Sequence, residues 1–457
     1  MQLVLLSGGS GKRLWPLSND ARSKQFLKVL ESNKIGRCSM VQRVWEQLGS
    51  VGLTDSTVIA TSKSQVDMIQ NQIGQEVPLI IEPQRRDTFA AIALSATYLY
   101  SIKGVSLNEV VGVLPVDPFV DSDFFNRVTD LEKEINNSSA QVGLIGVKPT
   151  FPSEKYGYIV PNSGSLKGDF IKVSHFKEKP SQEDAKNLIN QGALWNCGVF
   201  AFKLKYIISI LEGRGLPISY EELIKQYEIL PKKSFDYEVV EKASEIIALP
   251  YEGYWKDLGT WNTLTEEMAT NIIGKGVISK DSKNVHLLNE LDIPVAVLGM
   301  KNAVIAVSPD GVLVSDKEVS PKVKELVEKF DERPMYEERR WGWYRVLDHT
   351  TFGEENEVLT KRICVKAGKN ISYQLHRKRS ETWTIINGKG KFALNDRVIK
   401  VKSGDVLQIP VGAKHGIMAI TDLEFIEIQT GSELIEEDIT RIFMEWEEVE
   451  SNCLIKG

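Results

Sequence analysis

The chain has 457 residues, of which 42% are hydrophobic and 26% are charged, and its formal net charge is −6. This length exceeds what one hydrophobic core holds, and the composition is that of ordinary globular proteins, so we expect two or three domains. The negative charge argues against nucleic acid or an anionic membrane as a partner. No apolar run approaches the ~18 residues needed to span a bilayer.

Cysteine usage and the N-terminal sequence bear on the compartment. The four cysteines, at positions 38, 197, 364 and 453, are scattered and show neither metal-type nor disulfide-type spacing, which is typical of a reducing cytoplasm. The apolar run at the N-terminus is short and lacks a basic flank, so it is predicted to be a core strand and not a signal peptide. We therefore expect a cytoplasmic protein.

The first predicted element is a strand over residues 3–6 that leads into a glycine-rich loop. Four apolar residues bounded by glycine predict a strand buried on both faces, as in a parallel sheet. Glycine permits positive φ and lets backbone N–H groups approach an anion closely. The loop residues, which end in two cations, are Gly8, Gly9, Ser10, Gly11, Lys12 and Arg13. They predict a polyphosphate site, and a mere tight turn is the alternative interpretation.

The rest of the chain divides into three stretches. Residues 1–265 alternate apolar runs, such as the strand predicted over 142–147, with segments of helical period, such as 40–48 and 90–100. This pattern predicts βαβ units and a Rossmann-like α/β domain with a mostly parallel, mixed sheet. Residues 266–335 are predicted to be a short β-rich segment with a Pro-Asp-Gly turn at 309–311, followed by a charged helix over 321–330 and a linker. From about 340 to 432 the pattern is β throughout, so residues 336–457 are predicted to form an all-β domain.

Two predicted strands of the first domain end in an aspartate. Asp117 follows an apolar run over residues 110–116, and Asp257 closes the segment 254–257. Open α/β sheets bind ligands at the carboxyl ends of their strands, and Mg²⁺ is held by one or two carboxylates together with phosphate oxygens. Both aspartates are therefore candidate Mg²⁺ ligands, although each alone also fits a solvated loop residue.

Residues 7–27 resemble the signature of the sugar-phosphate nucleotidylyltransferases, and their wording is similar to the mannose-1-phosphate guanylyltransferase branch. Ser23 stands where that family usually has proline, and Pro118 stands where it usually has histidine. Further stretches resemble family motifs in the same order, at 82–88, 114–117, 156–159, 176–180, 195–200 and 254–261. Matches in this order throughout the first domain argue against coincidence.

The resemblance implies that a sugar 1-phosphate attacks the α-phosphate of an NTP in line and expels pyrophosphate. Arg13 and Lys24 would clamp the phosphates. Asp117 and Asp257 would hold Mg²⁺, and Lys179 would position the attacking phosphate. The implied nucleotide-binding residues are Gly8, Gly9, Ser10, Gly11, Lys12, Arg13, Lys24, Glu82, Arg86, Asp87 and Thr88, and the implied sugar-phosphate residues are Gly157, Glu178, Lys179 and Asn196. Asp87 or Thr88 is also expected to cap the helix that follows.

Two histidines of the C-terminal domain belong to a metal-type pattern. Gln374 and His376 are two residues apart, so they share one face of a strand. Glu381 and His415 are expected to reach the same point from neighbouring strands. An imidazole, carboxylate and amide set suits Zn²⁺, Fe²⁺, Mn²⁺ or Ni²⁺, and the sequence does not choose among them.

These spacings resemble the two cupin motifs, and the order Gln-x-His-x₂-Arg-x-Glu is similar to type II phosphomannose isomerase. The resemblance implies a jelly-roll domain, a divalent transition metal such as Zn²⁺, and a mannose-6-phosphate isomerase activity. Arg379 would then lie near the phosphate or the reacting oxygens of the substrate. Thr382 and the pair Arg377-Lys378 depart from the family's pattern.

The first hypothesis is thus an enzyme that makes GDP-mannose from GTP and mannose 1-phosphate, with isomerase activity in the cupin as a further expectation. The second is a monofunctional transferase of other base or sugar specificity, whose cupin serves dimerisation or ligand sensing. The third is a protein that binds nucleotide sugars without turnover, against which the intact Arg13, Lys24 and Asp117 argue. Because cupins often pair, a homodimer is expected.

Overall fold

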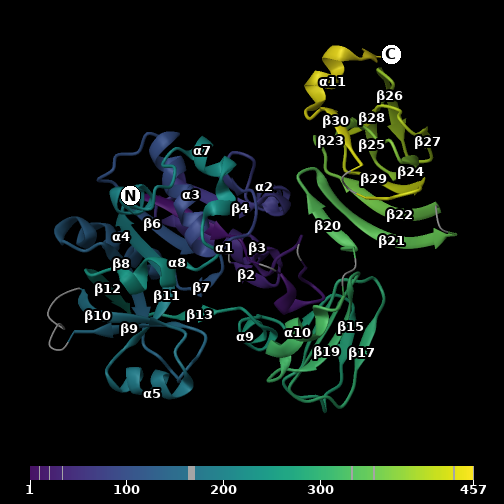
Figure 1. Ribbon diagram of the computed structural model, residues 1–457. Helices are drawn as coiled ribbons and strands as arrows, with labels where there is room; N and C mark the ends of the chain where they lie inside the picture. The colour runs from purple at the N-terminus through teal and green to yellow at the C-terminus, as the bar shows by residue number, and fades with distance from the viewer. Residues whose placement is uncertain are drawn as a thin grey trace. The chain divides into compact units, whose positions relative to one another are not determined.

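The computed structural model describes residues 1–9, 11–19, 21–32, 34–162, 170–330, 333–353, 356–435 and 438–455. It divides into two compact units. The first consists of Met1–Leu14, Ser23–Asn271 and Lys317–Lys324, and the second of Trp15–Arg22, Ile272–Asp316 and Glu325–Gly457. Figure 1 shows the elements of both units along the chain. The boundaries predicted at 265/266 and 335/336 stay predictions.

The first unit is built on a nine-stranded sheet. In spatial order its strands are β5 (Leu79–Glu82), β4 (Thr57–Ser62), β1 (Gln2–Ser7), β6 (Val110–Pro115), β11 (Leu194–Lys203), β8 (Val142–Val147), β12 (Ile246–Tyr251), β10 (Ile171–Glu178) and β9 (Gly157–Pro161). Strands β5, β4, β1 and β6 run parallel, and β8 is parallel to β12, whereas β11 runs antiparallel to both β6 and β8. The sheet is therefore mixed, which confirms the predicted α/β class.

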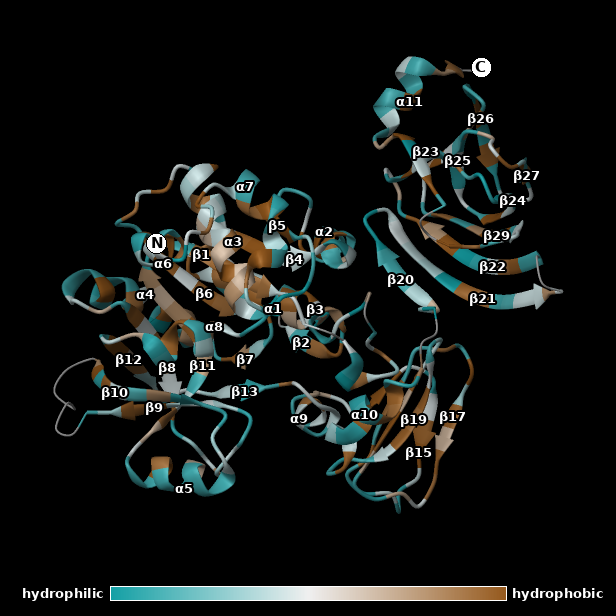
Figure 2. Cartoon of the chain, in the orientation of Figure 1, coloured by the Kyte–Doolittle hydropathy of each residue, from teal (hydrophilic) through white to brown (hydrophobic). Residues whose placement is uncertain are grey.

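Helices cover both faces of this sheet because its strands bury alternate residues in two different cores. In β1, Val4 belongs to one core, and Leu3 and Leu5 belong to the other. The helices of this unit are α1 (Met40–Ser50), α2 (Val66–Gln72), α3 (Asp87–Ser101), α4 (Asp123–Asn137), α5 (Gln182–Asn190), α6 (Leu204–Gly213), α7 (Tyr220–Lys225), α8 (Phe235–Glu238) and α9 (Trp261–Glu266). Figure 2 shows hydrophobic residues along much of α3, most of whose side chains are buried. The buried strands end at a common edge, where the loops carry the candidate residues.

Short elements attach to the main sheet near that edge. The 3-10 helices Lys12–Leu14 and Lys24–Phe26 lie in the signature segment. The ribbons β2 (Leu30–Ser32) with β3 (Gly36–Cys38) and β7 (Pro118–Val120) with β13 (Trp255–Asp257) are antiparallel. The second ribbon places Asp257 directly opposite Pro118, which follows Asp117.

The β-rich segment of the second unit forms two small sheets. Its strands are β14 (Ile272–Ile273), β16 (His286–Asn289), β18 (Ala303–Ser308) and β19 (Gly311–Asp316) in one sheet, and β15 (Gly276–Ile278) and β17 (Val295–Val297) in the other. The Pro-Asp-Gly turn joins β18 to β19 as an antiparallel hairpin. The charged helix is shorter than predicted, because α10 covers only Val323–Val327 after a 3-10 turn at Ser320–Lys322.

The C-terminal part of the second unit consists of two six-stranded sheets. The first contains β20 (Tyr336–Arg339), β21 (Gly342–Phe352), β22 (Asn356–Val365), β29 (Leu423–Gly431), β24 (Arg379–Asn387) and β27 (Val406–Ile409). The second contains β30 (Thr440–Phe443), β23 (Asn370–Leu375), β28 (His415–Ala419), β25 (Lys389–Leu394), β26 (Arg397–Lys402) and β31 (Leu454–Ile455), and helix α11 (Trp446–Asn452) joins its last strands. Apolar side chains of both sheets share one core. This cupin-like arrangement agrees with the predicted all-β domain.

Candidate functional site

The glycine loop lies at the carboxyl end of β1, beside the end of β6. Leu6 pairs with Pro115, so Gly8 and Asp117 follow neighbouring strands at the same edge. Neither Gly8 nor Gly9 has a positive φ, and a Cβ atom would meet nothing within 4 Å at Gly9 and only Glu82 Oε1, at 3.5 Å, at Gly8. Gly8 and Gly9 therefore do not use their freedom to adopt positive φ in this structure. What they leave in this structure is uncovered backbone.

A cavity of about 350 Å³ opens at this edge. Its lining residues are Leu6, Ser7, Gly8, Gly9, Ala60, Glu82, Arg85, Arg86, Asp87, Thr88, Ala91, Pro115, Asp117, Gly198, Phe200 and Asp236. Six of the predicted nucleotide-binding residues thus face one space together with Asp117. The volume falls within the range of small-molecule sites.

The segment around α3 shapes one wall of the cavity. The Tyr227 hydroxyl donates to Glu82 at 2.7 Å, and burial of the Glu82 carboxyl raises its pKa. Arg86 Nε donates to the carbonyl of Leu230 at 2.8 Å. Helix α3 begins at Asp87 itself, whose carboxylate accepts from the adjacent N–H of Thr88, so among the described residues no side chain forms the predicted cap.

Lys24 joins the two candidate magnesium ligands. Its Nζ lies 2.8 Å from Asp117 Oδ2 and 3.2 Å from Asp257 Oδ1. Burial disfavours the ammonium group, but the two carboxylates outweigh burial and hold the pKa of Lys24 above its usual value. A second cavity, of about 280 Å³, opens over this triad and shares Pro115, Asp117 and Gly198 with the first. The two carboxylates therefore face one cation position, as two ligands of the same metal ion must.

The predicted sugar-phosphate residues lie beside two carboxylates, Glu178 and the half-buried Asp236, and the sequence did not indicate Asp236. Lys179 Nζ lies 2.7 Å from Glu178 Oε1, and Asn196 Nδ2 donates to Asp236 Oδ1 at 3.0 Å. Burial and the neighbouring Glu178 raise the pKa of Asp236 to about 7. Gly157 pairs with Glu178 across β9 and β10, and a Cβ at this position would lie 2.6 Å from Glu178 Oε2. Gly157 thus makes room for the carboxylate.

The remaining loop residues lie apart from these cavities. Lys12 and Arg13 belong to the 3-10 helix after the loop, Arg13 is exposed, and neither lines the two cavities. Ser10 lies outside the described residues. Of the two cations expected to clamp phosphates, Lys24 therefore points into the site and Arg13 stands outside its lining in this structure.

In the cupin-like part, three predicted metal ligands meet in the barrel. His376 Nε2 and His415 Nε2 lie 3.3 Å from Glu381 Oε1 and Oε2, respectively, and all three side chains are buried. Gln374 Nε2 lies 3.3 Å from His376 Nε2, and its Oε1 accepts from Ser372. Arg379 donates to Glu381 Oε1 at 2.9 Å.

The surroundings of this cluster fit a divalent metal. The Nδ1 atoms of His376 and His415 lie within hydrogen-bond distance of the carbonyls of Asp438 and Ala413, so both rings turn Nε2 inward. His415 Nε2 is buried and, although it lies 3.3 Å from Glu381 Oε2, it makes no hydrogen bond of good geometry with any described residue. Burial lowers the pKa of His376, and although burial alone would raise that of Glu381, the two imidazoles and Arg379 hold it well below its usual range. Neutral imidazoles and an ionised carboxylate are the donor forms that metals bind.

Comparison with known proteins places both parts of the chain. The model of the family described as "Nucleotidyl transferase" matches residues 2–272, which is more than half of the chain. The chain belongs to the nucleotidyl transferase family. The family described as "Mannose-6-phosphate isomerase C-terminal" matches residues 329–444.

Relatives of this nucleotidyl transferase are similar over nearly its whole length. A "Mannose-1-phosphate guanylyltransferase" of Salmonella montevideo is 29% identical over 96% of this chain and 98% of its own. A "Putative mannose-1-phosphate guanylyltransferase" of Vibrio cholerae is 30% identical over 96% and 98%. A crystal structure described as mannose-1-phosphate geranyltransferase from Thermus thermophilus matches with a TM-score of 0.60 and 28% identity, over 73% of this chain and all of that one.

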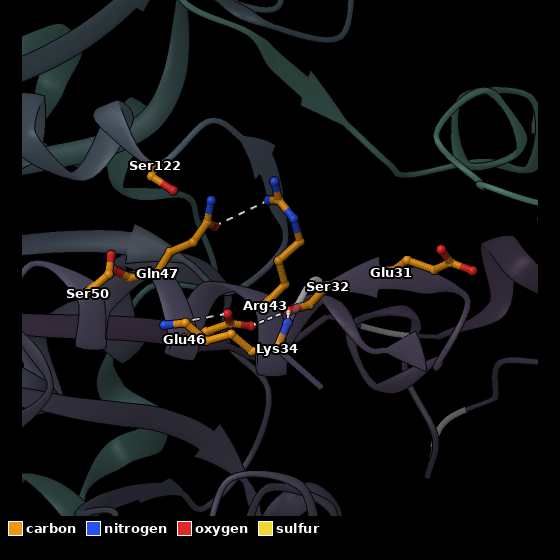
Figure 3. A pocket seen from close by; sticks show the side chains of 8 residues that line it. All are labelled: Glu31, Ser32, Lys34, Arg43, Glu46, Gln47, Ser50 and Ser122. Atoms are coloured by element: carbon orange, nitrogen blue, oxygen red, sulfur yellow. Dashed lines mark hydrogen bonds and ion pairs between the residues drawn. The ribbon is translucent and has the colours of Figure 1, made fainter. Parts of the chain in front are cut away.

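The nucleotidyl transferase unit has another cavity away from these residues. It measures about 320 Å³ and is lined by Glu31, Ser32, Lys34, Arg43, Glu46, Gln47, Ser50 and Ser122. Figure 3 shows three pairings among these side chains: Ser32 donates to Glu46, Lys34 pairs with Glu46 at 3.8 Å, and Arg43 donates to Gln47. None of the predicted site residues lines it.

Two groups of residues near the sites were not predicted. Asp236 lies forty residues beyond its partner Asn196, and its sequence context indicates only a helix start. Around Glu381, the Trp383 indole N–H donates to Oε2 at 3.1 Å, and Gln429 Nε2 to Oε1 at 3.4 Å; both also donate to the buried Glu427. The alternation along β29 could have indicated Glu427 and Gln429, because both are polar residues at positions that face the core.

Among the described residues, no helix combines the length and the apolar composition of a membrane span.

Proposed function

We propose that this nucleotidyl transferase forms GDP-mannose and pyrophosphate from GTP and mannose 1-phosphate. The observation that carries the proposal is the Lys24–Asp117–Asp257 triad, with separations of 2.8 and 3.2 Å, at the edge where the glycine loop leaves the sheet. The names of the relatives supply the base and the sugar. Another NTP or another sugar 1-phosphate is the alternative.

In the proposed reaction the protein supplies positions and charge. The phosphate of the sugar is already an anion at neutral pH, so no protein nucleophile is needed, and charge neutralisation at the phosphoryl oxygens lowers the barrier. Lys24, held beside two carboxylates, offers its ammonium group to the phosphates, and Arg13 adds a second cation from the exposed loop. Lys179 and Glu178 orient the sugar phosphate, and Asn196 and Asp236 face its hydroxyls.

Mg²⁺ is the proposed cofactor of this site. Asp117 and Asp257 would hold it, since their carboxylates already enclose one cation, the Lys24 ammonium group. When bound, Mg²⁺ neutralises charge on the triphosphate and on the departing pyrophosphate. Before substrate and metal enter, Lys24 neutralises only one of the two carboxylate charges, which leaves the triad negative and favours a metal cation.

The experiment is a matrix of GTP, ATP, CTP and UTP against mannose 1-phosphate and other sugar 1-phosphates, with pyrophosphate release as the readout. We expect the highest kcat/KM for GTP with mannose 1-phosphate, and none without Mg²⁺. Faster pyrophosphate release from another pair would assign the specificity to that NTP and that sugar 1-phosphate. Absence of release from every pair would reject the transferase.

A second proposed activity is the interconversion of mannose 6-phosphate and fructose 6-phosphate in the cupin-like part. It is supported by the buried His376–Glu381–His415 cluster and by the family match over residues 329–444. A divalent transition metal such as Zn²⁺ would be held by these three residues and Gln374, and would polarise the carbonyl of the sugar. Arg379, 2.9 Å from Glu381, would bind the reacting oxygens or the phosphate. A coupled isomerase assay on metal-loaded protein tests it; a metal-bound protein without isomerisation would leave a non-catalytic module.

We also propose a cytoplasmic homodimer. The four cysteines are free and buried, which suits a reducing compartment. Light scattering of the full chain gives the mass, and a monomer at micromolar concentration would reject the dimer.

A further inference from the structure

Next to the candidate metal ligand Glu381, the inner faces of β24 and β29 carry four buried side chains with polar atoms. Glu381 and Trp383 lie two residues apart on β24. Glu427 and Gln429 lie two residues apart on β29, directly opposite Trp383 and Glu381, respectively. Residues two apart on one strand, and residues directly opposite on the next, share a face of the sheet. The four side chains, which we call the polar square, therefore form one patch of the core-facing surface.

Hydrogen-bond donors and acceptors alternate around the polar square. The Trp383 indole Nε1 lies 3.1 Å from Glu381 Oε2 and 3.0 Å from Glu427 Oε1. The Gln429 amide Nε2 lies 3.4 Å from Glu381 Oε1 and 2.9 Å from Glu427 Oε2. All four side chains are at most 4% exposed, so solvent has little access to these contacts. The two carboxylates therefore share two donors, and each donor is nearer to Glu427.

Glu381 is the member of the polar square that meets the candidate metal ligands His376 and His415. Its Oε1 and Oε2 lie 3.3 Å from their Nε2 atoms, one oxygen to each ring. Glu427, diagonally across the square, accepts from both shared donors, one with each of its oxygens. Because both oxygens are engaged in this way, Glu427 is suited to holding the donors in place and not to transferring a proton to a substrate.

Lys361 supplies a counter-charge beside Glu427. The register of β22 and β29 places it directly opposite Glu427, and its side chain is 4% exposed. Its Nζ lies 4.6 Å from the ring centroid of Tyr344. Opposite charges directly across an antiparallel pair stabilise one another, and a carboxylate removed from water needs such compensation. The polar square thus combines fixed hydrogen-bond geometry with a second carboxylate whose charge is compensated.

We propose that Glu427 is a positioning residue for the metal ligand Glu381, acting through the two shared donors. This role rests on the metal site of the proposed isomerase. Because Glu427 fixes both donors, the two oxygens of Glu381 keep the orientation in which each faces one histidine. Loss of a group that orients a metal ligand lowers metal affinity by about 10–100-fold.

The test compares Glu427→Gln with Glu424→Gln in the full chain, with Co²⁺ as the probe. Both substitutions replace a glutamate of β29 by its amide, but Glu424 accepts from Arg362, at 3.0 and 2.6 Å, and lies outside the polar square. The readouts are the Kd of Co²⁺, by competition with a chelator, and the visible absorption spectrum of bound Co²⁺, which depends on ligand geometry.

In Glu427→Gln, one shared donor faces an NH₂ group in place of an oxygen. We therefore expect the Kd of Co²⁺ to rise by about 10–100-fold and the spectrum to shift, whereas Glu424→Gln should match the wild type in both readouts. An unchanged Kd and spectrum in Glu427→Gln would overturn the positioning role.

A double variant separates position from charge. Glu427→Gln also removes a negative charge from the barrel, which by itself would weaken the binding of a cation. Glu427→Gln combined with Lys361→Met keeps the net charge of the wild type but still lacks one acceptor, so we expect the Kd of Co²⁺ to stay raised by about tenfold or more. A return to the wild-type Kd and spectrum would assign the effect to charge and overturn the positioning role.

Gln429→Met keeps the test decisive if Glu427→Gln does not fold. It removes one shared donor and leaves both carboxylates, so we expect a smaller rise in the Kd of Co²⁺, and an unchanged Kd would overturn the positioning role. Failure of the proposed isomerase looks different, because Co²⁺ would bind with these variant effects while mannose 6-phosphate stays unconverted. Wild-type protein that binds no Co²⁺ would reject the metal site and the positioning role together.

Discussion

The two sites of this chain handle charge in opposite ways. In the first unit, the Lys24, Asp117 and Asp257 side chains are 17, 24 and 39% exposed. In the cupin-like part, the His376, Glu381 and His415 side chains are at most 2% exposed. The first site is open, and its two carboxylates share one lysine, a pairing that the proposed phosphate and Mg²⁺ would replace. The second is closed, and its donors are oriented by backbone carbonyls and by indole and amide N–H groups, an arrangement that suits the proposed metal ion.

The two sites thus differ in the exposure of their charged side chains and in the partners that hold them. The difference predicts that variants at either site leave the other activity intact. It also predicts which substitutions act by removing a charge and which act by filling space in the site.

The largest expected effect is on transferase chemistry. Asp257→Asn removes one of two carboxylates that converge on a cation, so kcat for pyrophosphate release should fall by about 10²–10³-fold, the loss typical of removing a group that stabilises charge in the transition state. Steady-state kinetics at saturating Mg²⁺ measure it. Asp130→Asn, which removes an exposed carboxylate paired with Arg127, is the control and should change kcat by less than about twofold. Equal losses in both variants, or loss of isomerase activity in Asp257→Asn, would contradict the separation.

Next in size is metal binding in the cupin-like part. His376→Ala removes a ligand whose Nδ1 is already held by a backbone carbonyl. Metal affinity should fall by at least about 100-fold, since replacing even a residue that only hydrogen-bonds to a ligand lowers affinity by about 10–100-fold. Elemental analysis of dialysed protein gives the stoichiometry. His349→Ala removes an exposed histidine that lies 3.5 Å from Glu357 and should keep full metal content. Retention of metal in His376→Ala would remove the ligand assignment.

A smaller effect tests space in the open site. Gly157→Ala would place a Cβ 2.4 Å from Phe176 Cζ and 2.6 Å from Glu178 Oε2, so the carboxylate must move. We expect the KM for sugar 1-phosphate to rise by about tenfold with a stability loss of about 1–3 kcal/mol. Gly213→Ala adds a Cβ with nothing within 4 Å and serves as the control. An unchanged KM for sugar 1-phosphate in Gly157→Ala would separate Glu178 from that substrate.

The smallest effect is a pH dependence in the same site. Burial and Glu178 raise the pKa of Asp236 to about 7, while Lys179 and Asn196 oppose the rise. An unfolded aspartate ionises near pH 4, so above that pH the unfolded chain gives up a proton that the folded chain keeps, and Asp236 destabilises the fold increasingly up to about pH 7. Asp236→Asn removes this loss and keeps an acceptor for Asn196. The Tm of the variant minus that of the wild type should be larger at pH 8 than at pH 4, by about 2 °C or more. A Tm difference that does not change with pH would assign the titration to another group.

Much of the fold followed from local patterns. The strand predicted over 142–147 is β8 (Val142–Val147), and the helices predicted over 40–48 and 90–100 lie within α1 and α3. Continuous apolar runs and helical periods report burial directly, so they suffice for such elements. The helix predicted over 321–330 is shorter because α10 ends at Val327, and only Val323 and Val327 of it are buried.

The sites divide differently. Motif resemblance placed Lys24, Asp117 and Asp257 in one reaction, and the structure brings them together, although their roles stay predictions. The motif resemblance did not indicate Asp236, or Glu427 near Glu381, because each is hydrogen-bonded to a residue far away in the chain. Nor did it indicate that Arg22, inside the signature, pairs with Glu290.

By itself, the sequence determined which segments become strands, which residue types stand at their ends, and which family the chain resembles, because these depend on neighbours a few residues away. Only the tertiary structure decided that Lys24 occupies the place between two aspartates, that both barrel histidines turn Nε2 inward, and that residues 15–22 pack in a different unit from their chain neighbours. The physical reason is that the exposure, the pKa and the contacts of a side chain depend on groups that the fold brings together across hundreds of residues, and a local sequence pattern does not identify these groups.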